Sequence, residues 1–320
     1  MLTRLIPRLA AALVAAATLM TTIAGARAQD KLKVAIPQRG AWDAGVAELG
    51  LRGGIFKKHG LDLDILYVQA GPESIQALIG GSIDIAVAAG VSAAVGTFAK
   101  GAPIRIIGSE MIGSPDLYWY VPTASPIRKV SDFNGKTVAY SLTGSSSHAG
   151  LLALMAQDKL TCKPTSTGNI TATITQTMTG QVDVGFGAAP FGLDLVEDGK
   201  IRIIATGNDV VSLRTRTVRV NLTSVNDLQT KGDAIARFNR AYQETVAWMY
   251  SDPAALEVYG DYSGLPEKIV LRVRNLIPKE SMATGRLEGV DQIMADAVAA
   301  KFIPAPLSAD QVKELVQIPK

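Results

Sequence analysis

From about residue 31, apolar positions switch repeatedly between the two-residue period of strands and the longer period of helices. Leu61–Tyr67 has an apolar residue at every second position, which predicts a strand. Ala41–His59 is predicted to be helical with a break at Gly53-Gly54, ending in two lysines before Gly60. Further strands are expected over 31–36, 83–87 and 104–108, and helices over 72–78 and 91–99. This order predicts a largely parallel sheet covered by helices.

A similar run of elements follows, with strands expected over 136–140, 182–186 and 201–205 and helices over 146–157, 171–178 and 190–196. Residues 75–89 match residues 174–188, each an amphipathic helix, a glycine and a strand centred on an aspartate. Asp84 and Asp183 occupy equivalent places in the two copies. We therefore predict an α/β protein with two related lobes, with a single sheet as the alternative.

The chain from about Thr217 is predicted to be mostly helical, including a helix over 282–300. One apolar stripe there is expected to pack in the core and comprises Ile235, Phe238, Tyr242, Val246 and Met249. Because this tail has no strand–helix repeat, we expect it to pack on the first lobe, so that the chain crosses between lobes near 118–122 and near 206–218. The predicted division is a signal peptide (1–28), lobe 1 (29–118 with 216–320) and lobe 2 (119–215).

The first 28 residues have the three parts of a secretory signal peptide. Arg4 and Arg8 precede an apolar run, and Ala26-Arg27-Ala28 is a small-x-small cleavage pattern. The run is short for a retained membrane anchor, so we expect cleavage after Ala28. The only cysteine is Cys162, which excludes an internal disulfide, and the new N-terminus is not the cysteine that a lipid anchor needs. We expect a free periplasmic protein.

The charge of the chain changes when the signal is removed. Three of its 32 basic residues lie in the signal, so 29 basic and 29 acidic side chains remain. No basic run or basic–aromatic interleaving occurs, and we therefore expect no nucleic-acid partner.

The loop at Ser141–His148 is the most informative candidate site, because ligands of α/β sheets bind where strands lead into helices. Its hydroxyl and backbone N–H groups are predicted to converge at the positive end of a helix, which suits an anionic oxygen group. The alternative is a plain helix N-cap by Ser145 or Ser146.

Other side chains give little sign of catalysis. Ser147 and His148 are adjacent on a helix and so do not face each other as a catalytic pair. Two distant histidines, one cysteine and no clustered carboxylates argue against a metal or hydrolytic site, so no enzyme, metal or cofactor is expected. Trp42 is a candidate pocket wall, with packing as the alternative.

Several motifs together resemble periplasmic substrate-binding proteins of nitrate/sulfonate/taurine-type ABC transporters, of the NMT1/THI5-like, type II periplasmic binding fold. The motifs are residues 54–63, 77–86, 101–105, 132–138 and 144–148, and the resemblance spans essentially the whole mature chain. The resemblance implies two α/β domains, each a mostly parallel sheet flanked by helices. It also implies that the domains close over a small anion, which is then delivered to permease subunits, and that the protein acts as a monomer. The ligand-binding residues it implies are Gln38, Trp42, Ala89, Gly90, Thr143, Gly144, Ser145, Ser146 and His148.

Two other functions remain open at this point. Some enzymes and binders of a thiamine-pyrimidine precursor share this fold, although the chain is exported and has one cysteine. A binding protein that presents its ligand to a sensor is the other. The sequence does not name the ligand.

Overall fold

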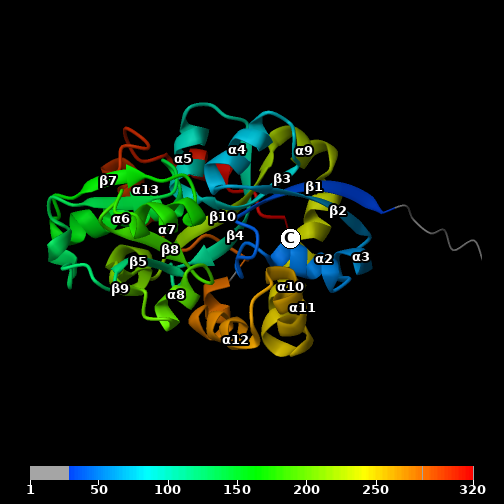
Figure 1. Ribbon diagram of the computed structural model, residues 1–320. Coiled ribbons are helices and arrows are strands. Elements are labelled where there is room, and N and C mark those ends of the chain that lie inside the picture. Colours follow the sequence, from blue (N-terminus) through cyan, green and yellow to red (C-terminus); the bar gives the residue numbers. More distant parts are fainter. Residues whose placement is uncertain (1–28, 283, 320) are drawn as a thin grey trace, which may run out of the picture.

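A computed structural model describes residues 29–282 and 284–319, and the expected signal peptide lies outside them. The first lobe is built on a five-stranded sheet in the order β2 (Leu61–Val68), β1 (Asp30–Pro37), β3 (Ile85–Gly90), β10 (Thr217–Ser224) and β4 (Ile104–Ile112). β1 pairs in parallel with β2 and β3, whereas β10 runs antiparallel to β3 and β4 (Figure 1). The expected parallel sheet is therefore present with one reversed strand.

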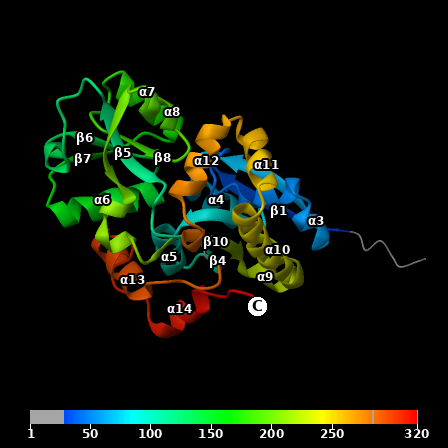
Figure 2. The same ribbon diagram turned by 90° about the horizontal axis from the view of Figure 1, so that it is seen from below.

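The second lobe contains two small sheets. β8 (Gly185–Ala188), β5 (Leu117–Pro122) and β9 (Ile201–Thr206) form an antiparallel sheet in that order. β6 (Thr137–Tyr140) and β7 (Lys163–Ser166) pair in parallel, and a bridge from Val138 to Val184 links β6 to the chain just before β8. Figure 2 separates this lobe, drawn in green, from the first.

Helices cover both lobes. The first lobe carries α2 (Val46–Arg52), α3 (Ile55–Lys58), α4 (Gly71–Ile79) and α5 (Val91–Ala99), and the second carries α6 (Ser146–Asp158), α7 (Ile170–Met178) and α8 (Leu193–Glu197). The C-terminal helices are α9 (Val225–Thr230), α10 (Gly232–Ser251), α11 (Ala254–Ser263), α12 (Glu267–Leu276), α13 (Val290–Ala299) and α14 (Ala309–Leu315). α10 and α11 pack on α2, α13 packs on α5 and α14 packs on β4, so the tail completes the first lobe.

The tail differs from expectation at two places. Thr217–Ser224 is not part of the helical region but a strand inside the first sheet, and all but its last residue are buried because both faces are covered. The helix expected over 282–300 begins only at Val290, because Gly289 before it has a φ of 65° in the left-handed region. The apolar stripe of α10 is buried in the core as expected.

The chain passes between the lobes twice. β4 ends at Ile112 and β5 begins at Leu117, so residues 113–116 form the first connection. The return runs over residues 207–216, between β9 and β10. No helix among the described residues has the length and apolar character needed to cross a membrane.

The two copies of the repeated segment use their aspartates alike. The carboxylate of Asp84 accepts a hydrogen bond from the backbone N–H of Lys33 in β1 (2.9 Å). The carboxylate of Asp183 accepts one from the backbone N–H of Thr137 in β6 (2.8 Å). Each aspartate thus ties the chain just before the strand of its copy, β3 or β8, to another strand of the same lobe, β1 or β6.

Candidate functional site

A small cavity of about 40 Å³ lies between the two lobes and is called the inner cavity. The first lobe contributes the turn after β1, the end of β3 and one side chain of β10, and the second contributes the Ser141–His148 loop and β8. The lining includes Gln38, Asp43, Gly90, Asp116, Ser145, Ser146, Ala188 and Arg219. The ends of strands from both lobes therefore meet at one place, as expected for α/β sheets.

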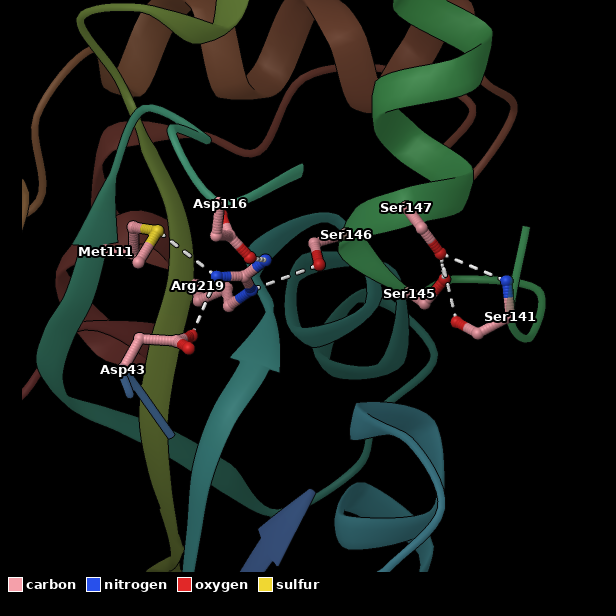
Figure 3. A network of polar contacts seen from close by, with 8 residues as sticks. All are labelled: Asp43, Met111, Asp116, Ser141, Ser145, Ser146, Ser147 and Arg219. Atoms are coloured by element: carbon pink, nitrogen blue, oxygen red, sulfur yellow. Dashed lines mark hydrogen bonds and ion pairs between the residues drawn. The ribbon is translucent and has the colours of Figure 1, made fainter. Parts of the chain in front are cut away.

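Arg219 on β10 is the centre of a buried polar network (Figure 3). Its guanidinium donates from Nη1 to Asp43 (2.8 Å) and to the Met111 sulfur (3.1 Å), and from Nη2 to Asp116 (2.7 Å). Its Nε donates to the hydroxyl of Ser146 at the start of α6 (3.1 Å). These residues are called the Arg219 cluster, and the last contact joins the two lobes.

The cluster holds its charges out of water. Although burial alone would lower the pKa of Arg219, the neighbouring Asp116, Asp43 and Glu110 raise it, so the guanidinium stays charged. Burial raises the pKa of Asp43, and the positive charge of Arg219 opposes that shift. Burial also raises the pKa of Glu110 well above its ordinary value of 4.5. Neither carboxyl oxygen of Glu110 has a hydrogen-bond partner within the described chain, which fits a protonated acid.

Asp116 differs from Asp43 in the hydrogen bonding of its second carboxylate oxygen, Oδ1. Its Oδ2 accepts from Arg219, but its Oδ1 is buried and has no hydrogen-bond partner among residues 29–282 and 284–319. The residue is 1% exposed and lines the inner cavity. An unpaired buried carboxylate oxygen is costly unless a ligand or water supplies a donor.

The Ser141–His148 loop, called the Ser loop, is bonded mostly to itself. Ser145 accepts from the backbone N–H of His148 (3.2 Å), which makes it the N-cap of α6. Ser147 bonds the hydroxyls of Ser145 (2.9 Å) and Ser141 (3.0 Å) and accepts from the backbone N–H of Ser141 (3.1 Å). Ser146 is the serine that reaches across the cleft to Arg219. The N-cap is therefore present, and an anion here would use the first-turn N–H groups of α6.

Four of the expected ligand-binding residues line the inner cavity, namely Gln38, Gly90, Ser145 and Ser146. Gly144 lines only a smaller gap beside it. Gly90 packs so tightly against the Ser loop that a Cβ there would lie 2.8 Å from the Gly144 carbonyl oxygen. The lobes are thus in direct contact at this point.

The other four expected residues lie away from the cavity lining. Trp42 is buried in the core, where its indole donates to Tyr250 (3.0 Å) and its ring packs edge-on to Tyr259. Ala89 is buried in β3 and its neighbour Ala88 lines the cavity instead, because successive residues of a strand face opposite sides.

Thr143 is exposed at the tip of the Ser loop. His148 stacks on Tyr140, with ring centroids 4.3 Å apart, and its Nδ1 accepts from the backbone N–H of Gly144 (3.3 Å). Burial lowers the pKa of His148, which favours the neutral ring that this bond requires.

Sequence reasoning missed the charged residues of the site. Arg219 stands between Val218 and Val220 in a run of alternating apolar residues, and a lone charge in such a strand is the one available signal. Asp43 and Asp116 lie in loops earlier in the chain, and their spacing in the sequence does not relate them to Arg219. The described residues contain no group of three or more histidine, cysteine or acidic side chains placed to hold a metal ion.

A wider space, called the outer basin, adjoins the inner cavity at Gln38. It measures about 270 Å³ and is also lined from both lobes, by Gln38, Arg39, Tyr67, Val68, Gln69, Asn169, Ile170, Thr171 and Phe191. The Asn169 amide donates to Gln69 across it (2.5 Å). On α8, Glu197 pairs with Lys268 (2.7 Å) and Arg272 (3.0 Å) of α12, again between lobes. Polar contacts therefore join the lobes at the outer basin and beyond it, as well as at the inner cavity.

Comparisons with solved structures give the same architecture. The fold is similar to the alkanesulfonate-binding protein SsuA of Xanthomonas axonopodis pv. citri bound to MOPS (TM-score 0.75, 23% identity, 90% of this chain and 98% of that one). It is also similar to the periplasmic aliphatic sulphonate binding protein SsuA of Escherichia coli (TM-score 0.72, 20% identity, 91% of this chain and 92% of that one). The periplasmic nitrate-binding protein NrtA of Synechocystis PCC 6803 matches with a TM-score of 0.69 and 12% identity, over 90% of this chain and 86% of that one. These likenesses confirm the expected two-lobed periplasmic-binding-protein fold.

A comparison with curated protein sequences finds no match. The family model described as NMT1/THI5 like matches residues 49–256, which is well over half of the chain. That stretch runs from α2 through the second lobe and β10 to α11 and includes Asp116, Ser146 and Arg219. The chain belongs to the NMT1/THI5-like family.

Proposed function

We propose that the protein is the periplasmic solute-binding component of an ABC importer, which captures a small solute between its lobes and delivers it to permease subunits. The observation that carries this proposal is a cavity lined from both lobes, with a buried ion-pair network on one wall and a helix N-terminus on the other. The similar structures named for sulfonate and nitrate binding support it.

The remaining expectations from the sequence are part of the same proposal. The protein acts as a monomer in the periplasm, is not an enzyme and needs no cofactor. The solute has an oxygen-bearing anionic group that meets the α6 N-terminus, because the first-turn N–H groups there favour negative charge. For the lobes we propose the division 29–118 with 216–320 and 119–215, and the strand bounds favour a first connection over 113–116.

Binding would act by hinge closure. The polar contacts that join the lobes include Arg219 with Ser146, Asn169 with Gln69, and Glu197 with two cations of α12. His148 of the second lobe also packs edge-on to Phe302 of the first. The ion pairs of Glu197 are partly exposed and contribute little, so the closed form would need a ligand to become dominant. The permease would then read the closed geometry.

A thermal-shift screen of small solutes, followed by calorimetry, tests this function. A solute that binds only the folded chain raises the melting temperature with concentration, and at a hundred times its Kd adds about 2.7 kcal/mol of stability. We expect at least one small polar solute to do so and to bind with one-to-one stoichiometry. A chain that binds none of them, and that carries no small molecule when isolated from periplasm, would contradict the proposal.

A further inference from the structure

The Ser loop meets the first lobe at a second place, through residues that do not line the inner cavity. Gly144 lies there against α5, and a Cβ on it would be 3.2 Å from the Ala93 side chain and 3.8 Å from the Phe302 ring. His148 lies edge-on to Phe302, with the ring centroids 5.9 Å apart. The lobes therefore also touch at a contact that we call the back seam, which comprises Ala93, Gly144, His148 and Phe302.

Phe302 is held on the first lobe by its backbone. It follows α13, and its N–H donates to the carbonyl of Ala297 (2.8 Å). Its own carbonyl oxygen lies so close to α5 that a Cβ on Gly96 would be only 3.0 Å away. Because Phe302 lies beyond residue 256, where the family match ends, that match does not imply its contact with His148. The back seam thus sets a fixed ring of one lobe against a histidine of the other.

His148 supports the Ser loop only when its ring is neutral. Its Nδ1 accepts from the backbone N–H of Gly144 (3.3 Å), and the ring stacks on Tyr140 of β6 with the centroids 4.3 Å apart. An imidazolium carries a proton on both nitrogens, so protonation would set two donors against each other at this bond. Since a partly buried N–H without an acceptor is costly, the charged ring disfavours the loop geometry that forms the back seam.

The elements around His148 supply no anion that would offset its positive charge. α5 and β6 contain no charged residue, and the only one in α6 is Asp158 at its far end. Lys301, in the turn after α13, is exposed, and Arg216, which lines the small gap beside the Ser loop, pairs with an aspartate of α13 (2.9 Å). Tyr140 is the titratable group in the stack. Burial lowers the pKa of His148 from its ordinary value of 6.5, so closure and protonation oppose each other.

We propose that His148 and Phe302 form a pH-sensitive latch, which holds the two lobes closed while the histidine is neutral. The inference concerns the regulation of the proposed solute-binding site and rests on that function. Both are positioning residues, since neither lines the inner cavity.

The direction of the effect follows from the proton bound by each form. In the open form Phe302 no longer covers His148, so the open form binds a proton more readily than the closed form. The latch is therefore fully formed above pH 6.5 and weakens as the pH falls from 6.5 through the lowered pKa. For one proton, the ratio of closed to open chains falls by at most about tenfold per pH unit. Solute would be held less firmly in acid.

Proton NMR of the ligand-free mature chain tests the contact, because only His59 and His148 give imidazole signals and His59→Gln assigns them. We expect His148 to titrate below 6.5. Its pKa should rise toward 6.5 in Phe302→Ala and stay low in Phe302→Leu, which keeps an apolar cover. Leu271→Ala, a truncation at an exposed position of α12, is the control and should leave the pKa unchanged. An unchanged pKa in Phe302→Ala would overturn the role of Phe302.

Small-angle X-ray scattering of the ligand-free chain tests the effect on closure. The radius of gyration should rise between pH 7.5 and pH 5 in the wild type. The rise should be absent in His148→Phe, which keeps a ring between Tyr140 and Phe302 but takes up no proton. A wild-type radius that does not change, or an equal change in His148→Phe, would overturn the latch. This result does not depend on the folding of the Phe302 variants, and a solute-binding chain without a latch would still bind a solute in the thermal-shift screen.

Discussion

The Ser loop and the Arg219 cluster face each other across the inner cavity, and they hold their polar groups in different ways. Within the Ser loop, hydrogen-bond partners are two to six residues apart along the chain. Arg219 contacts partners 73 to 176 residues away, from both lobes. The loop is thus a local structure that one segment can form, whereas the cluster exists only when the whole fold is assembled.

The difference also concerns charge. The Ser loop offers neutral hydroxyls and backbone groups, which adapt because a hydroxyl both donates and accepts. The Arg219 cluster contains charged groups, and one carboxylate oxygen of Asp116 has no hydrogen-bond partner in the part of the chain that the structure describes. We therefore expect changes in the cluster to affect folding and ligand choice strongly, and changes in the loop to have smaller effects.

Removing the cation should give the largest effect. Arg219→Met leaves Asp43 and Asp116 buried without their partner, which should cost about 3–5 kcal/mol of unfolding free energy. Urea denaturation measures this. Arg240→Met, the same change at an exposed position of α10, is the control and should stay within about 0.5 kcal/mol of the wild type. A loss below about 1 kcal/mol for Arg219→Met would show that the cluster is not the fixed part of the site.

Glu110 should make the stability of the cluster depend on pH. Because burial raises its pKa above 4.5, the folded chain keeps a proton that the unfolded chain releases, so stability falls as pH rises from 4.5 through the folded pKa. The slope is at most about 1.4 kcal/mol per pH unit for one proton. Glu110→Gln removes this part of the slope. Urea midpoints between pH 5 and 8 should therefore diverge in favour of the variant, and parallel curves would contradict this reasoning.

A substitution at Gly90 tests the contact between the end of β3 and the Ser loop. In Gly90→Ala the new Cβ would lie 2.8 Å from the Gly144 carbonyl oxygen and hinder closure, whereas the glycine's own φ of −61° suits alanine. We expect roughly tenfold weaker ligand binding by calorimetry, equivalent to about 1.4 kcal/mol, with stability little changed. Gly232→Ala is the control, because a Cβ there has nothing within 4 Å. Undiminished affinity in Gly90→Ala would show that binding does not need this contact.

The Ser loop should give the smallest effects. Ser145→Ala removes the N-cap of α6 and should cost about 1 kcal/mol of stability. Ser145→Ala combined with Ser146→Ala also removes the bond to Arg219, so affinity for an anionic probe should fall. If the double variant keeps full affinity for that probe, the hydroxyls of this loop do not hold the anionic group.

Local features of the fold were predictable from the sequence because they depend on short-range patterns. The alternation of Leu61–Tyr67 appears as β2, the helix break appears at Gly53-Gly54 between α2 and α3, and the helix predicted over 146–157 begins at Ser146. β10 was missed because Thr217–Ser224 is buried on both faces and sits in the first sheet although it follows the second lobe in sequence. Short runs of this kind do not reveal which sheet they will join.

The same distinction between short-range patterns and long-range contacts applies to the residues of the site. Ser145 and Ser146 could be placed at the cleft because a serine-rich turn before a helix has a local meaning. Asp43 and Asp116 could not be related to Arg219, since the ion pairs depend on three segments that meet only in the folded chain. For Trp42 the sequence left open whether it borders the pocket or packs, and in the structure it packs against Tyr250 and Tyr259 of the C-terminal helices.

The central claim is that the two lobes close around a small solute at the Arg219 cluster. Small-angle X-ray scattering of the mature chain, with and without a saturating solute identified by calorimetry, tests it most directly. We predict that the radius of gyration falls on saturation in the wild type and falls less in Gly90→Ala, whose closure is obstructed. A radius of gyration that stays the same at full saturation would contradict closure as the mechanism.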